Sequence, residues 1–106
     1  VCTLGSKNNF KTIIVVQPIL GSGNKPLTEF EKKTGISDAT KTIDSMANAL
    51  NDLNEYCDKT ADFRNSFDGI ADPIFIDNGH TNDLGNKIIA HRMFQISMDL
   101  PPKPSN

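Results

Sequence analysis

The chain has 106 residues, which is enough for one small domain or for part of a larger one. Its formal net charge of −2 and its pI near 5.5 argue against nucleic acid or an anionic membrane as a partner, because both attract strongly basic surfaces. No apolar run approaches the roughly 20 residues that a membrane-spanning helix needs, so no membrane span is predicted.

Two cysteines, Cys2 and Cys57, are too few for a disulfide scaffold, and no group of cysteines and histidines has the spacing of a zinc site. The two thiols could pair, but two reduced thiols are the favoured interpretation. The compartment stays open, because the chain begins with Val1 and a signal peptide that has been removed leaves no trace.

The first two predicted elements are the end of a helix and a buried strand. Val1–Leu4 is apolar and is followed by Gly5, as glycine commonly follows the last turn of a helix. The stretch 10–18 contains four consecutive β-branched aliphatic residues, Ile13 to Val16, which is typical of a strand buried on both faces of a parallel sheet. Pro18 ends this strand because proline has no backbone N–H to donate.

Two helices are predicted next, after a glycine-containing loop. Thr28 and Glu31 have the spacing of a capping box, which predicts a helix that begins near Leu27 and is interrupted at Gly35. From 37 to 57, apolar residues recur at intervals of three and four, which predicts an amphipathic helix with one buried face. The residues of that face are Ala39, Ile43, Met46, Leu50, Leu53 and Cys57.

The remaining predicted elements are two short strands and a helix. The stretches 60–63 and 73–77 are predicted as strands, and 78–82 as a turn. Asn82 or Thr81 can cap a helix whose apolar residues form a broad stripe. Those residues are Leu84, Ile88, Ile89, Met93 and Ile96.

Strand, helix, strand and helix in this order indicate an α/β fold with a parallel sheet. The two clearest predicted strands, within 10–18 and 73–77, cannot form such a sheet by themselves, and a core of this size would leave both faces of Ile13–Val16 poorly covered. We therefore expect 1–100 to be half of a larger domain. The Pro-rich tail at 101–106 is predicted to be a disordered terminus.

Asp77 and His80 are the candidate catalytic residues, because they lie three apart in a turn that follows a predicted strand. A carboxylate at that position can accept a hydrogen bond from the imidazole Nδ1, which fixes the tautomer and leaves Nε2 free. Gly79 between them permits the backbone angles of a tight turn. An imidazole held in this way is a general base for a hydroxyl nucleophile. The spacing alone is weak evidence, because polar turns often contain both residue types.

The run 74–90, IFIDNGHTNDLGNKIIA, resembles the last conserved block of the SGNH (GDSL-like) serine hydrolases. That block contains an apolar strand, Asp-x-x-His, a Gly-Asn pair and an aliphatic helix. A more diffuse similarity extends to 13–18, which is similar to a family strand ending in Gln-Pro, and to 62–68, so that it covers about 10–98. The resemblance implies the C-terminal half of a three-layer α/β/α, flavodoxin-like sandwich with a parallel sheet.

By position, the resemblance implies that His80 is the general base and that Asp77 orients it in a Ser-Asp-His triad. The implied activity is hydrolysis of a small ester or an O-acylated carbohydrate, of the lipase, esterase or carbohydrate O-acetyl esterase type, with no cofactor and no metal. The family's Gly-Asp-Ser turn, second-block glycine and Gly-x-Asn-Asp block do not occur in the chain. We therefore expect an N-terminal half to supply the nucleophilic serine, and the isolated chain to be inactive.

Other polar groups have simpler explanations. The stretch Gly21–Asn24 contains residue types found in the Gly-Asp-Ser turn and in the Gly-x-Asn-Asp block, but it matches neither motif. The chain also has no G-x-S-x-G nucleophile motif. A metal site formed by Asp77, His80 and Asp83 is a minor alternative, because Asp83 suits the first turn of a helix. His91 is expected on the side of a helix, partly exposed and without a function.

Gln17 and Pro18 end a strand at the edge where α/β folds bind ligands, so they could border the site, although strand termination is their plain role.

A second functional class is also open, namely a non-catalytic binding or assembly domain with a half SGNH fold. In that alternative, Asp77 and His80 only brace the last helix. A serine-bearing second chain near His80 favours the enzyme, and a second copy of this chain at the sheet edge favours the alternative.

Overall fold

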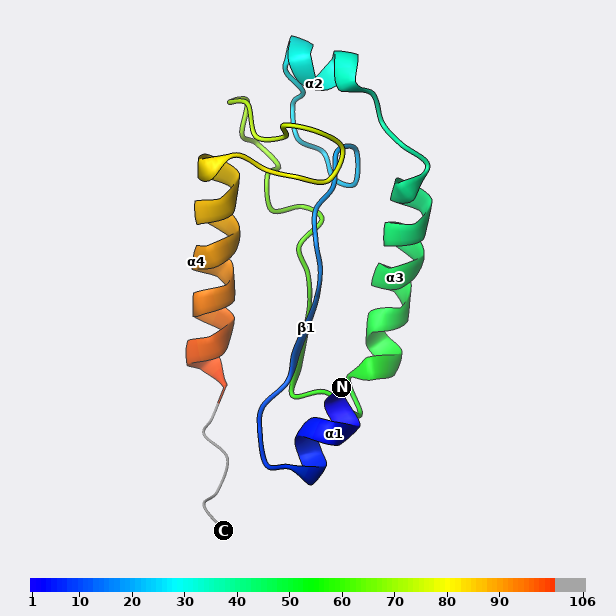
Figure 1. Ribbon diagram of the computed structural model, residues 1–106, viewed down its shortest axis with the longest axis vertical. Helices are drawn as coiled ribbons and strands as arrows, with labels where there is room; N and C mark the ends of the chain where they lie inside the picture. The colour runs from blue at the N-terminus through cyan, green and yellow to red at the C-terminus, as the bar shows by residue number, and fades with distance from the viewer. Residues whose placement is uncertain (101–106) are drawn as a thin grey trace.

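The computed structural model describes residues 1–100, so the predicted Pro-rich tail at 101–106 lies outside the described residues. Helices and strands alternate along this part of the chain (Figure 1). They are α1 (Cys2–Lys7), β1 (Ile13–Val16), α2 (Glu29–Thr34), α3 (Ala39–Leu53), β2 (Lys59–Asp62) and α4 (Asp83–Asp99). The predicted order of strand, helix, strand and helix is therefore present.

The sheet consists of β1 and β2, which run parallel with Ile13 opposite Lys59 and Val16 opposite Asp62. The connection between the strands contains α2 and α3, and α3 packs against both strands. In Figure 1, α3 and α4 flank the strand pair on opposite sides, with α2 at one end and α1 at the other. The described chain is thus of mixed α/β class with a parallel sheet, as predicted, and this sheet has two strands.

A first core forms where one face of α3 packs on β1. Its buried members are Val16, Ile19, Ile43 and Leu50, with Ile14 and Ala47 packed against them. The predicted apolar stripe of α3 is only partly buried, because Met46 and Leu53 remain 50% and 37% exposed. Two strands are too narrow to cover the whole helix face, since neighbouring strands lie only about 5 Å apart.

The prediction for Gly5 is wrong, because Gly5 lies inside α1 rather than after it. The helix ends at Lys7, with Asn8 as its C-cap. A Cβ atom at Gly5 would come within 2.6 Å of the Thr12 side chain and 3.0 Å of the Phe10 carbonyl oxygen. Glycine is needed here because two segments approach each other closely, not because the helix ends.

The predicted capping box of α2 is confirmed. The Glu31 N–H donates to the Thr28 hydroxyl oxygen at 3.2 Å, and the Thr28 N–H donates to the Glu31 carboxylate at 2.9 Å. Gly35 ends the helix with a φ of +79°, in the left-handed region that favours glycine. The interruption predicted at Gly35 therefore has a backbone cause.

The predicted strand at 73–77 is wrong, because this segment does not join the sheet. Residues 74–82 form instead a narrow loop with two antiparallel legs, which we call the 74–82 loop. The Ile76 N–H of the first leg donates to the His80 carbonyl oxygen of the second at 3.0 Å. The N–H groups at the start of the segment donate to the buried Glu31 carboxylate, so they are not available to a neighbouring strand.

A second core packs against the 74–82 loop and fixes the first turns of α4. Its buried members are Leu20, Phe67, Ile74 and Phe75, with Leu27, Ile70, Ile88 and Ile89 packed against them. The rings of Phe67 and Phe75 meet edge to face, with their centroids 5.5 Å apart. Further along α4, the Arg92 guanidinium lies 4.3 Å from the centre of the Phe63 ring. The 74–82 loop therefore packs against a well-formed hydrophobic core.

Cys2 and Cys57 form a disulfide, so the favoured interpretation of two reduced thiols is wrong. The bond joins the first turn of α1 to the residues that follow α3, and both cysteines are buried. The two residues lie 55 apart in sequence, and only the folded arrangement of α1 beside the end of α3 brings them together.

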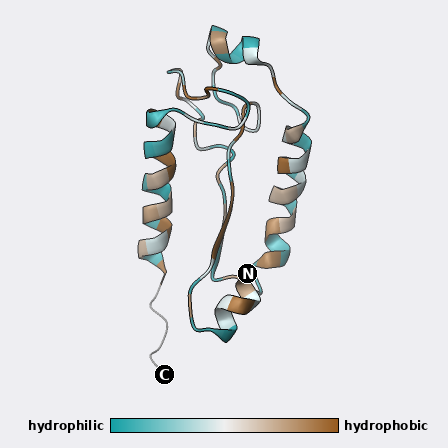
Figure 2. Ribbon diagram, in the orientation of Figure 1, coloured by the Kyte–Doolittle hydropathy of each residue, from teal (hydrophilic) through white to brown (hydrophobic). Residues whose placement is uncertain are grey.

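Several large apolar side chains lie on the surface of the described residues. On α4, Phe94 and Met98 are 61% and 69% exposed, and apolar and polar residues are mixed along that helix (Figure 2). Figure 2 also shows the apolar character of β1, whose first three residues are only partly buried. Within residues 1–100, no helix combines the length and the apolar character that a membrane crossing requires. Apolar surface on β1, α3 and α4 is thus available to a further layer of structure.

Candidate functional site

The two candidate residues lie at the tip of the 74–82 loop, which shares a pocket with the residues that follow β1. Asn78 anchors this tip in two directions. Its carbonyl oxygen accepts from the Leu20 N–H at 2.9 Å, and its side-chain amide donates to the Gly35 carbonyl oxygen at 2.6 Å. The segments that follow β1 and α2 therefore hold the tip in place.

The predicted contact between Asp77 and His80 is present. The imidazole Nδ1 of His80 lies 2.8 Å from Oδ2 and 3.0 Å from Oδ1 of Asp77. Oδ1 also accepts from the backbone N–H groups of Gly79 at 2.9 Å and of His80 at 2.7 Å. One carboxylate therefore fixes both the backbone of the turn and the orientation of the ring.

The N–H groups of Gly79 and His80 hold the pKa of the Asp77 carboxyl below its ordinary value, and the imidazole adds to this effect. An ionised carboxylate has no proton to donate, so Nδ1 must carry the hydrogen of the bond between Asp77 and His80. The neutral imidazole is then the Nδ1–H tautomer, with the lone pair of Nε2 free. A general base needs this state.

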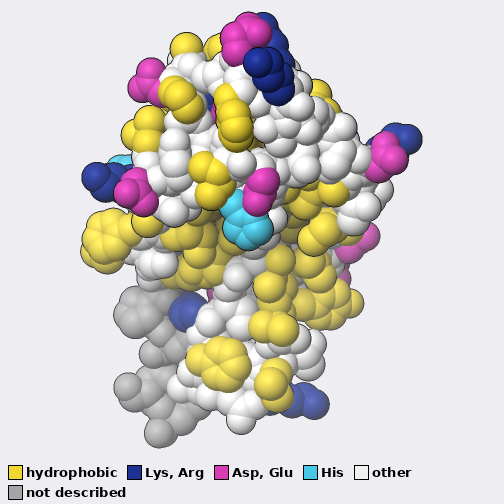
Figure 3. Space-filling model, turned by 45° about the horizontal axis from the view of Figure 1, so that its top comes forward, with side chains coloured by type: hydrophobic (Ala, Val, Ile, Leu, Met, Phe, Trp, Pro, Cys, Tyr) yellow, Lys and Arg dark blue, Asp and Glu magenta, His cyan; other side chains and the backbone are white. Residues whose placement is uncertain are grey.

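His80 lines an open pocket of about 440 Å³. Its side chain is 79% exposed, and that of Asp77 is 55% exposed. Gln17 and Pro18, whose plain role is strand termination, also line this pocket, together with Gly79, Thr81, Asn86, Ile89 and Ala90. On the face shown in Figure 3, hydrophobic side chains gather on both sides of a central histidine and its acidic neighbour. The pocket therefore places an imidazole beside apolar, amide and hydroxyl groups.

None of the described residues that line the His80 pocket is a serine. Ser22, within Gly21–Asn24, is engaged in its own turn, because its hydroxyl donates to the Ile19 carbonyl oxygen at 2.7 Å and accepts from the Ile19 N–H at 2.9 Å. Ser37 lines a neighbouring depression of about 320 Å³, and its hydroxyl accepts from a backbone N–H of α3 at 3.2 Å. Among the described residues, the His80 imidazole and its Asp77 carboxylate therefore have no serine hydroxyl in their pocket.

Across residues 1–100, no three acidic, histidine or cysteine side chains come together as metal ligands. Asp83 occupies the first turn of α4, where the Asn82 side chain caps the helix by accepting from the Gly85 N–H at 3.1 Å. His91 is exposed on α4 and does not line the pocket of His80. The alternative of a metal site at the turn finds no ligand set in this part of the chain.

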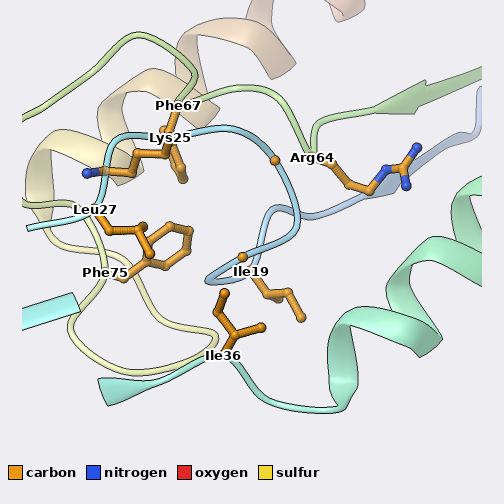
Figure 4. A pocket seen from close by; sticks show the side chains of 9 residues that line it. Ile19, Lys25, Leu27, Ile36, Arg64, Phe67 and Phe75 are labelled. Carbon is orange, nitrogen blue, oxygen red and sulfur yellow. The ribbon is translucent and has the colours of Figure 1, made fainter. Parts of the chain in front are cut away.

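Arg64 is held by acidic neighbours. Its guanidinium lies 2.8 Å from Asp62 and 2.7 Å from Asp44, and these carboxylates raise the pKa of Arg64 further above its ordinary value. Figure 4 shows this guanidinium pointing away from a cavity of about 100 Å³, which lies against the second core. The other cation beside the cavity, Lys25, is paired with Glu31. A ligand in this small cavity would meet mainly apolar side chains.

Sequence patterns indicated Glu31 only as a helix cap and missed a buried network. The Glu31 side chain is 0% exposed, and the ammonium of Lys25, 5% exposed, lies 2.8 Å from its Oε1. Its Oε2 accepts from the N–H groups of Ile74 at 3.1 Å and Phe75 at 2.9 Å. A capping box does not distinguish an exposed glutamate from a buried one, because burial depends on what packs over the helix.

We predict that acid weakens the fold through Glu31. Burial raises the pKa of Glu31, but the Lys25 ammonium and three backbone N–H groups lower it further, to about 2 from its ordinary 4.5. Because the folded-state pKa is the lower one, this stabilisation is complete above about pH 5 and is lost as the pH falls toward about 2. The difference corresponds to roughly 3 kcal/mol of unfolding free energy.

Urea denaturation between about pH 2 and pH 7 measures this dependence. Glu31→Gln should remove most of the decline in unfolding free energy below about pH 5. Glu29→Gln is the matched control, because Glu29 lies on the same helix with its side chain 84% exposed, and it should keep the decline. The same decline in Glu31→Gln as in the wild type would contradict the prediction.

Comparisons of the chain with known protein families, curated proteins and solved structures give no match. The function is therefore argued from the residues and geometry of the turn itself.

Proposed function

We propose that the chain is the base-bearing part of a serine ester hydrolase of the SGNH type, in which His80 is the general base and Asp77 orients it. The observation that carries the proposal is the distance of 2.8 Å between Nδ1 and the Asp77 carboxylate, on an exposed turn. This contact leaves Nε2 free, as Ser-His-Asp hydrolases require. The neighbouring residues Gln17 and Pro18 follow β1, and ligands of open α/β sheets bind at the carboxyl ends of strands.

In the proposed reaction, Nε2 of His80 takes the proton of a serine hydroxyl while the serine oxygen attacks the ester carbonyl. Asp77 stabilises the imidazolium, which returns the proton to the leaving alcohol as the ester C–O bond breaks and the acyl-serine remains. A water molecule then attacks the acyl-serine with the same base, and the carboxylic acid and the free serine are released. His80 ends the cycle neutral, so the reaction needs no cofactor.

The serine is expected on a segment that adds to the outer edge of β1. The Lys59 N–H of β2 donates to the Thr12 carbonyl oxygen, so Thr12 faces β2. Backbone groups alternate in direction along a strand, so Ile13 and Val15 present theirs to the opposite edge. Within residues 1–100, β1 pairs with β2 and with no other strand. Because β1 is aliphatic and β2 is mainly polar, β1 has the character of a central strand.

The pocket at the turn suits an ester with a polar alcohol. Ile89 and Ala90 provide apolar contacts for a short acyl group, and Gln17 and Asn86 bring amide groups to the same pocket. The Thr81 hydroxyl donates to Oδ1 of Asn86 at 2.5 Å, which orients that amide. Amides of this kind can bond the hydroxyl groups of a carbohydrate. O-acylated carbohydrates and small acyl esters are therefore the proposed substrates.

A serine-directed probe tests the proposal in the native protein. A fluorophosphonate, which reacts with activated serines, is applied to protein captured through this chain, and the labelled peptide is identified by mass spectrometry. We expect one labelled serine, on a segment other than residues 1–106, and loss of the label in His80→Ala. His91→Ala should keep the label, because His91 lies outside the pocket.

Absence of any label on folded protein, or a label unchanged in His80→Ala, would contradict the proposal. Native mass spectrometry of the same material shows which polypeptides accompany the 11.6 kDa chain. A second copy of this chain without a labelled serine would support the binding or assembly alternative instead.

A further inference from the structure

Glu31 connects α2 to the loop that carries the proposed catalytic pair. Its Oε2 accepts from the N–H groups of Ile74 at 3.1 Å and Phe75 at 2.9 Å. Its Oε1 accepts from the Lys25 ammonium at 2.8 Å and from the Thr28 N–H at 2.9 Å. The residue is 0% exposed, so water does not compete for these bonds. Donors from the helix start and from the loop converge on one carboxylate.

The bonds to Glu31 hold the first leg of the 74–82 loop, and this leg holds the second. The Asn82 N–H donates to the Ile74 carbonyl oxygen at 2.8 Å. The Ile76 N–H donates to the His80 carbonyl oxygen at 3.0 Å. A continuous set of hydrogen bonds therefore runs from α2 to the backbone of His80.

We propose that Glu31 is a positioning residue that holds the turn so that His80 keeps its hydrogen bond to Asp77, an inference that rests on the proposed function of this pair. Glu31 does not line the His80 pocket, so it acts only through the loop. An acceptor at Oε2 is required because two backbone donors of the loop face it. Oε1 of Glu31 pairs with the Lys25 ammonium, so one carboxylate oxygen binds Lys25 and the other binds the loop.

The tautomer of His80 reports the position of the turn. An ionised Asp77 within hydrogen-bond distance holds the proton on Nδ1, whereas an imidazole without such a partner carries it mainly on Nε2. Long-range ¹H–¹⁵N NMR correlations distinguish the two forms. A change in global stability alone does not change the tautomer of the folded protein, so this measurement separates positioning from a general contribution to folding.

The test compares two double variants that share Lys25→Met. With Glu31→Gln, the side chain keeps a carbonyl oxygen for the two loop N–H groups, because no ammonium competes for it. With Glu31→Met, the side chain has a similar length and no comparable acceptor. Neither variant leaves an unpaired buried charge. The two proteins therefore differ mainly in the acceptor that faces the loop.

We expect Lys25→Met/Glu31→Gln to keep the Nδ1–H tautomer of His80, and Lys25→Met/Glu31→Met to shift it toward Nε2–H. In the complete hydrolase, the second variant should lose about 10- to 100-fold in kcat with little change in KM, because a misplaced base slows proton transfer without removing substrate contacts. An unchanged tautomer in the second variant overturns the inference, whatever its melting temperature.

If Lys25→Met/Glu31→Met does not fold, an ester in place of the Phe75 amide, introduced by semisynthesis, removes one loop donor and leaves Glu31 and Lys25 unchanged. The His80 tautomer should shift in the same direction, and an unshifted tautomer overturns the inference. The NMR measurement needs no serine. A tautomer effect in protein that no serine-directed probe labels would mean that the proposed function fails while the role of Glu31 holds.

Discussion

If the proposed hydrolase function is right, His80→Ala should lower kcat of the complete protein by a factor of about 10⁴ to 10⁶. Without the imidazole, no group at the turn takes the proton of the attacking serine. KM should change little, because the proposed substrate contacts lie on other residues of the pocket. The His80 side chain is 79% exposed, so its removal should leave the fold intact. Hydrolysis of an acetyl ester, measured beside thermal unfolding, gives both results.

His91→Ala is the matched control for this experiment, because the second histidine of the chain is exposed on α4 and lies outside the pocket. It should turn over substrate at the wild-type rate. Wild-type turnover in His80→Ala would rule out the catalytic assignment. An equal loss in both variants would show that the effect does not come from the turn.

Reduction of the bond between Cys2 and Cys57 should lower the free energy of unfolding by roughly 4 kcal/mol. The bond closes a loop between residues 55 apart, so its loss returns conformational freedom mainly to the unfolded chain. Small domains have only about 5–15 kcal/mol of stability, so this loss would be a large fraction of the total. Because disulfides persist in oxidising compartments, we also expect the protein to fold in one.

Urea denaturation with and without dithiothreitol measures the contribution of the disulfide. The Cys2→Ser/Cys57→Ser variant should unfold at the midpoint of the reduced wild type and should not respond to dithiothreitol. A thiol titration of the native protein checks the bond directly. Two reactive thiols before reduction, or an unchanged midpoint after it, would contradict the prediction.

Local patterns predicted most of the helices and strands, because a few neighbouring residues encode each of them. The intervals between apolar residues predicted α3, and the spacing of Thr28 and Glu31 predicted the cap of α2. The run of β-branched residues predicted β1. The spacing of Asp77 and His80 predicted the contact between them, because both residues lie on the same turn.

Local patterns failed where a group outside the pattern itself decided the outcome. The segment 73–77 is apolar enough for a strand, but the Ile74 N–H donates to a carboxylate 43 residues away. Gly5 follows an apolar stretch as a helix C-cap would, but it is required by the Thr12 side chain that packs on it. In both cases the deciding group is invisible to any pattern read over a few residues.

By itself, the sequence determined an acidic α/β chain with Asp77 and His80 on one turn, because composition, hydrophobic periodicity and a spacing of three residues are local properties. Only the tertiary structure decided that Cys2 pairs with Cys57, that Glu31 is buried against the 74–82 loop, and that the turn shares a pocket with the end of β1. Each of these features depends on contacts between residues far apart in the chain. The packing of helices on strands sets such contacts, and no local pattern encodes them.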